Sequence, residues 1–176
     1  MIYEEVGYFY AYELFGQRDP EIIKFVENLP FDTGTDNPMD NHKRDFVCKL
    51  MGRIIDNLSV QNLKISEIKR LNNLLNLPED EYTLKEVEEA SGTEDYRNTF
   101  VKSMLKRDKR HMREREFDLE EIIDSVINGD CEPPMLLTTE GKTFVIDGRT
   151  RLYAAIAANT DINVRVIDSE TFKEAM

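Results

Sequence analysis

The residues best suited to chemistry in this chain of 176 residues are Asp147-Gly148-Arg149-Thr150-Arg151. An apolar run, residues 144–146, stops at the Asp-Gly pair, and good helix formers follow from Leu152. This pattern predicts a strand, a tight turn and a helix. The first turn of a helix offers backbone N–H groups and the positive end of the helix dipole. Two arginines and a threonine at that position predict a binding site for an anion such as phosphate.

Each residue of this segment has a role in such a site. Gly148 lets the main chain approach a phosphate, Arg149 and Arg151 supply charge-assisted hydrogen bonds, and Thr150 adds a hydroxyl. Asp147 either fixes the turn by accepting from backbone N–H groups, as is typical of Asp-Gly, or holds Mg²⁺ beside the phosphates. A structural alternative remains, in which the arginines form salt bridges with nearby carboxylates.

Residues 147–152, Asp-Gly-Arg-Thr-Arg-Leu, resemble the Asp-Gly-x-x-Arg-Leu signature of the ParB/sulfiredoxin superfamily. The order of predicted elements is similar to that of the family core: a helix at 118–128, Pro133-Pro134, a strand at 135–137, a turn at 140–141, the signature strand and helix, and a closing strand at 163–167. The resemblance covers about residues 113–168. It implies a small α/β domain whose Asp-Gly loop lies at the phosphates of a nucleotide, ATP or CTP with Mg²⁺.

The loop differs from two branches of that superfamily. Sulfiredoxin-like members have Cys and His where this chain has Arg149-Thr150, so reduction of a sulfinylated cysteine is not supported. Chromosome-partitioning members carry Gly-Glu-Arg-Arg before a DNA-reading domain, which we do not expect after the closing strand here. The short signature is more similar to ParB-like domains of phage and mobile-element proteins, for which nuclease, kinase or nucleotide-switch activities are proposed. By analogy with kinase-like members, Glu120 or Glu121 is a candidate catalytic base, although helix capping alone explains Glu121.

The N-terminal two thirds of the chain predict helices. The clearest amphipathic pattern covers residues 40–58, and shorter patterns cover 20–29 and 65–75. Residues 2–15 fit a helix or a strand, and the helical spacing of their apolar residues favours a helix. Thr83 with Glu86 has the spacing of a capping box, and another helix is expected from Thr93 to Leu105. The predicted fold class is therefore α+β: a mostly helical region, residues 1–112, followed by a small ParB/sulfiredoxin-like α/β domain, residues 113–176, with a short mixed sheet.

Charge and composition restrict the class of partner. The net charge of −12 argues against non-specific binding to nucleic acid. The exception is the basic segment 97–115, which either contacts DNA or is a solvated helix end. No apolar run approaches the roughly 18 residues of a membrane span, and the N-terminus lacks a basic signal-peptide region, so we expect a cytoplasmic protein. The cysteines (Cys48, Cys131) and histidines (His42, His111) lack metal-ligand spacing.

Two functions follow from these observations. The first is a ParB-like nucleotide phosphate-binding protein, an NTP-dependent enzyme or switch of phage or mobile-element origin, for which turnover is left open. The second is a non-enzymatic acidic protein–protein interaction module, an inhibitor or adaptor on a ParB-like scaffold, which meets its protein partner through the helical region.

Overall fold

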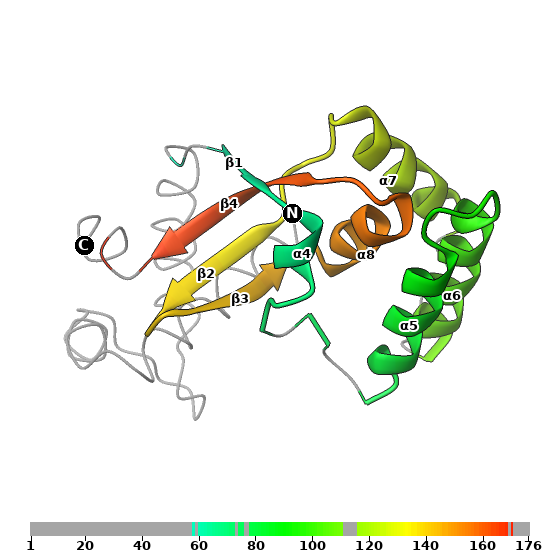
Figure 1. The fold of residues 1–176 in the computed structure, drawn as a ribbon, viewed down its shortest axis with the longest axis horizontal. Helices are drawn as coiled ribbons and strands as arrows, with labels where there is room; N and C mark the ends of the chain where they lie inside the picture. Colours follow the sequence, from blue (N-terminus) through cyan, green and yellow to red (C-terminus); the bar gives the residue numbers. More distant parts are fainter. Residues whose placement is uncertain are drawn as a thin grey trace, which may run out of the picture. The chain divides into compact units, whose positions relative to one another are not determined.

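The protein is described from a computed structural model, which places residues 58, 60–72, 74–75, 78–110, 116–168 and 170, and for 108–110 and 116–118 the backbone alone. The elements are β1 (Val60–Leu63), α4 (Ile65–Ile68), α5 (Asp80–Ala90), α6 (Tyr96–Arg110), α7 (Glu116–Asn128), β2 (Met135–Thr139), β3 (Lys142–Asp147), α8 (Arg149–Ala158) and β4 (Ile162–Asp168) (Figure 1). The described fold is α+β, as predicted.

Several predictions lie outside the described residues. They are the helices at 2–15, 20–29 and 40–58 (apart from Leu58), the side chains of His42, Cys48 and His111, and the domain boundary between residues 112 and 113. These stay predictions.

The chain divides into two compact units. One consists of Val60–Pro134 and Gly148–Val164, and it contains helices α4 to α8 with strand β1 and the start of β4. The other includes Met135–Asp147 and the described residues from Arg165 onward, which form β2, β3 and the end of β4.

Helix α8 is the centre of the helical unit. Six consecutive residues, Leu152–Ala157, are buried, and the helix contacts α4, α5, α6 and α7. A helix that is apolar all round is stable only when neighbours surround it. Fully buried side chains from those neighbours complete the core: Ile68, Val87, Phe100, Met104, Leu119 and Ile123. Each contributes about 1.5–3 kcal/mol relative to an exposed side chain.

The strands follow the predicted order. Strands β2 and β3 are antiparallel and pair Leu137 with Phe144 and Thr138 with Thr143. Both residues of the turn between them, Glu140 and Gly141, have positive φ, 53° and 74°, which is typical of a two-residue hairpin. Strand β2 also pairs in parallel with β4, and the sheet order is β1-β4-β2-β3. The predicted strands at 135–137, 144–146 and 163–167 are confirmed, although β3 extends from Lys142 to Asp147. Strand β1 was not predicted.

The helix predictions between residues 65 and 95 need correction. The expected helix at 65–75 ends at Ile68, and the chain then turns so that Leu74 enters the core with 2% of its surface exposed. The next helix starts at Asp80, not at Thr83. The N–H and the hydroxyl of Thr83 both donate to the carbonyl of Glu79, which places Thr83 inside the first turn. The helical spacing of apolar residues gave the wrong helix bounds here, because Leu74 and Asp80 are buried and their tertiary contacts determine where the helices begin and end.

Candidate functional site

The predicted anion-binding segment lies where a strand ends and a helix begins. Asp147 is the last residue of β3, and Gly148 is the N-cap of α8 with φ 94° and ψ 25°. The first helical hydrogen bond runs from the N–H of Leu152 to the carbonyl of Gly148, at 3.0 Å. Arg149, Thr150 and Arg151 therefore form the first turn, where N–H groups have no partner within the helix itself. All three are half-buried.

Gly148 is required here by two independent constraints. Its positive φ is costly for residues with a Cβ atom. A Cβ at this position would also lie 2.7 Å from the Cβ and 2.9 Å from the Cα of Pro134, closer than such carbons approach. The contact joins the Pro133-Pro134 segment to Gly148 at the start of α8.

Arg151 also links the start of α8 to the segment that precedes β2. Its Nη1 donates to the main-chain carbonyl of Glu132, and its Nη2 lies 3.1 Å from the position that a Cβ of Gly148 would take. The guanidinium therefore runs back over Gly148 toward the chain that precedes β2. Its charge also reaches Cys131, where it opposes the burial that raises the pKa of that thiol. Arg151 has a structural role whatever else it binds.

Asp147 stands opposite Met135 in the β2–β3 ladder and is half-buried. Among the described residues, no group of three or more His, Cys, Asp or Glu side chains could hold a metal ion by itself. A magnesium ion bound through Asp147 would depend on phosphate oxygens for further ligands. That role of Asp147 stays a prediction.

The two candidate bases lie on α7. The Oε2 of Glu120 accepts from Nη2 of Arg97 at 3.1 Å, and the same Nη2 lies 2.6 Å from Oδ1 of Asp124. The hydrogen bond to Glu120 is the main cause that raises the pKa of Arg97. These contacts link α7 to α6, whereas Glu121 is exposed. Catalysis by either residue stays a prediction.

In the described part of the basic segment 97–115, Arg97, Lys106 and Arg107 are paired with acids of the same unit. Besides Arg97, Lys106 lies 3.5 Å from Oε1 of Glu86, and Nε of Arg107 lies 2.9 Å from Oδ1 of Asp80. The exposed ion pairs of Arg97 and Lys106 are typical of a solvated helix end, whereas the buried Arg107 is not. Contact with DNA stays a prediction.

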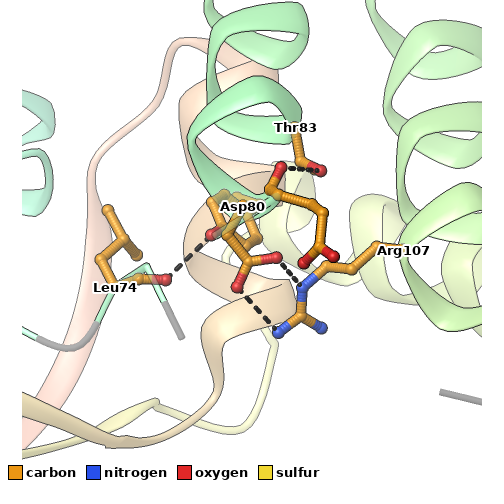
Figure 2. A network of polar contacts seen from close by, with 6 residues as sticks. Leu74, Asp80, Thr83 and Arg107 are labelled. Atoms are coloured by element: carbon orange, nitrogen blue, oxygen red, sulfur yellow. Dashed lines mark hydrogen bonds and ion pairs between the residues drawn. The ribbon is translucent and has the colours of Figure 1, made fainter. Parts of the chain in front are cut away.

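Sequence reasoning missed a buried polar cluster around α5, α6 and α8 (Figure 2). Asp80 has no exposed side-chain surface and Arg107 has 11%; Nε and Nη2 of Arg107 lie 2.9 and 3.5 Å from the two carboxylate oxygens. Nearby, the hydroxyl of the fully buried Tyr153 donates to the carbonyl of Leu74 at 2.9 Å. Burial raises the pKa of Tyr153, with Asp80 adding to the effect. No local sequence pattern marks the ion pair of Asp80 and Arg107, because Arg107 lies in a run of cations that resembles a solvated helix end.

Nothing in the described part of the chain is a helix long and apolar enough to cross a membrane. Comparison of this chain with family models, with curated proteins and with solved structures found no match.

Proposed function

We propose that the first turn of α8 binds the phosphate groups of a nucleotide. The observation that carries the proposal is the composition of that turn. Arg149, Thr150 and Arg151 follow a left-handed glycine that has no side chain to cap the helix, and the turn contains no acidic residue.

The electrostatics of this turn favour an anion. The N-terminus of a helix carries about half a positive charge, and acidic residues there stabilise the helix by about 0.3–1 kcal/mol each. Two arginines at this end add positive charge, in a chain with a net charge of −12. A phosphate at the same position would interact favourably with the dipole and with both guanidinium groups.

The loop is also held in place before any ligand arrives. Gly148 is packed against Pro134, and Arg151 is bonded to the carbonyl of Glu132. A rigid loop loses little conformational entropy on binding, so more of the interaction energy is expressed as affinity. In this proposal Arg149 and Thr150 contact the phosphate, while Arg151 contributes charge and holds the loop.

The resemblance of about residues 113–168 to the ParB/sulfiredoxin superfamily supports ATP or CTP with Mg²⁺ as the ligand, and Asp147 as the residue beside the metal ion. It also supports an NTP-dependent enzyme or switch of phage or mobile-element origin. In an enzyme, Glu120 or Glu121 would act as the base, and Glu120 would first have to leave Arg97.

Thermal unfolding with ATP, CTP or inorganic tripolyphosphate, each with Mg²⁺, tests the proposal. A ligand at 100 times its dissociation constant stabilises the folded state by about 2.7 kcal/mol, which raises the melting temperature. Arg149→Gln should remove the rise. Arg151→Ala should remove it too, and that change also breaks the bond to Glu132.

Arg97→Gln is the matched control, because it removes one arginine from α6 and leaves the first turn of α8 intact. It should keep the full ligand-induced rise. A melting temperature that none of the three ligands changes at millimolar concentration would disprove the proposal.

A second function, the acidic protein–protein interaction module, is favoured by the outer face of α5. Tyr82 is 65% exposed there, beside the exposed Glu81 and Glu89. Tyrosine is enriched at protein interfaces. A partner captured at low and moderate salt should be lost with Tyr82→Ser and kept with Lys85→Ser, a change at an exposed residue of the same helix. Equal capture by both variants would contradict this function for α5.

A further inference from the structure

A surface pocket of about 260 Å³ lies in the helical unit, and no function has been assigned to it. It is formed where β1, the end of α7 and the connection from α8 to β4 meet. Its lining includes Asn62, Val126, Cys131, Asp161, Ile162 and Asn163. None of these residues belongs to the first turn of α8.

The volume of the pocket limits the size of the ligand that it can hold. Pockets that enclose drug-sized molecules measure about 300–1,000 Å³. A pocket of about 260 Å³ lies just below that range and is large enough for one ring system. Val126 and Ile162, which are 3% and 4% exposed, contribute a small apolar part of the lining.

The charges that line the pocket select against anions. No Lys, Arg or His is among its lining residues within the part of the chain that the structure describes, and Asp161 contributes a carboxylate. The Oδ1 of Asp161 accepts from the N–H of Ile65 at 3.2 Å. A carboxylate has about four lone-pair positions, so it can also accept from an amino group of a ligand.

Two amides add both kinds of hydrogen-bonding group. The Nδ2 of Asn62 donates to Oδ1 of Asn163 at 3.4 Å, a long contact between exposed side chains. A side-chain amide has two N–H donors and a carbonyl acceptor, and Asn and Asp are among the side chains that recognise the amino edges of bases. A ligand with adjacent donors and acceptors can replace this weak contact with shorter ones.

We infer that this pocket binds a neutral, amino-bearing heterocycle of the nucleobase class, held by Asn62, Asn163 and Asp161 over the apolar surface of Val126 and Ile162. The inference goes beyond the phosphate site on α8 and does not depend on it. Nucleosides without phosphate are therefore the appropriate probes.

The thiol of Cys131 lines the pocket and reports whether it is occupied. The rate at which iodoacetamide alkylates Cys131, resolved by mass spectrometry of its peptide, is measured at one alkaline pH because burial raises the pKa of this thiol. Cytidine or adenosine at millimolar concentration should slow alkylation at least threefold, whereas uridine, which has no amino group, should not. The amide resonances of Gly129 and Asn163 should shift in the same titration.

Neighbouring residues of β1 give a matched pair of variants, because Asn62 lines the pocket and the exposed Gln61 does not. Asn62→Ala should abolish protection and Gln61→Ala should retain it. Asp161→Asn keeps an acceptor for Ile65 but should reduce the preference for cytidine over uridine. Unchanged alkylation and unchanged resonances with every nucleoside, equal protection by uridine, or full protection in Asn62→Ala would each overturn the inference.

Discussion

The Cα of Pro134 lies 2.9 Å from the point where a Cβ of Gly148 would stand. Fourteen positions separate the two residues along the chain, yet they leave each other no room for a methyl group. The chain before β2 and the start of α8 are therefore held at one fixed separation. Arg151 reinforces this separation through the carbonyl of Glu132.

Gly148→Ala should lower the free energy of unfolding by about 2–5 kcal/mol. A residue with a Cβ in the left-handed region costs about 1–2 kcal/mol, and forcing a methyl group against Pro134 adds about 1–3 kcal/mol. Gly92→Ala is the control, since Gly92 has φ +82° and no atom lies within 4 Å of the point where its methyl group would stand. Denaturant unfolding should show the larger loss at Gly148; equal losses would mean that the contact with Pro134 has no energetic effect.

Arg151→Met should slow the alkylation of Cys131 at pH values near its pKa. The positive charge of Arg151 opposes the burial that raises the pKa of Cys131, so its removal raises that pKa further and leaves less thiolate. The pH dependence of the alkylation rate should move to higher pH. Arg149→Met serves as the comparison and should leave the profile unchanged; a profile that also stays unchanged in Arg151→Met would contradict the described position of the guanidinium.

Arg107→Met should destabilise the protein by about 3–5 kcal/mol, because it leaves the carboxylate of Asp80 buried without its cation. The double variant Asp80→Leu with Arg107→Met should recover most of that loss, since no charge remains buried. Arg97→Met breaks an exposed ion pair and should cost at most about 1 kcal/mol. Urea unfolding of the four proteins measures these differences, and a double variant no more stable than Arg107→Met would show that packing dominates the site.

Raising the pH should weaken the fold through Tyr153. Burial raises its pKa in the folded state, so its contribution to stability is complete below the unfolded pKa of about 10 and is lost as the pH rises toward the folded value. Tyr153→Phe leaves the carbonyl of Leu74 without this donor and should cost about 1–3 kcal/mol at neutral pH. The difference between wild type and Tyr153→Phe in urea unfolding should shrink between about pH 9 and pH 11. A difference that is constant over this range would contradict the prediction.

Local sequence patterns were sufficient to predict the strands, turns and helices in the second half of the described chain. The apolar run before Asp147-Gly148, the Glu140-Gly141 turn and the alanine-rich run after Arg151 each match the geometry of one element. Hairpin turns and helix starts depend on a few neighbouring residues, so the sequence marks them directly. The same patterns placed two arginines at the start of α8.

Between residues 65 and 95 the spacing of apolar residues did not predict where the helices begin and end. The leucines and isoleucines there have helical spacing, yet α4 ends at Ile68 and Leu74 enters the core from a turn. Short helices are marginal without tertiary packing, so packing of the neighbouring helices decides where they stop.

Local residue patterns are enough to predict the elements from α7 to β4 and the cluster of positive charge at the first turn of α8. Three contacts depend on the folded chain: Arg151 bonds to the carbonyl of Glu132, Arg107 is buried with Asp80, and Asn62 contacts Asn163. The difference comes from distance along the chain. Turns and helix starts are set by neighbours within a few residues, whereas these pairs lie 19, 27 and 101 residues apart and meet only when the core around α8 has formed.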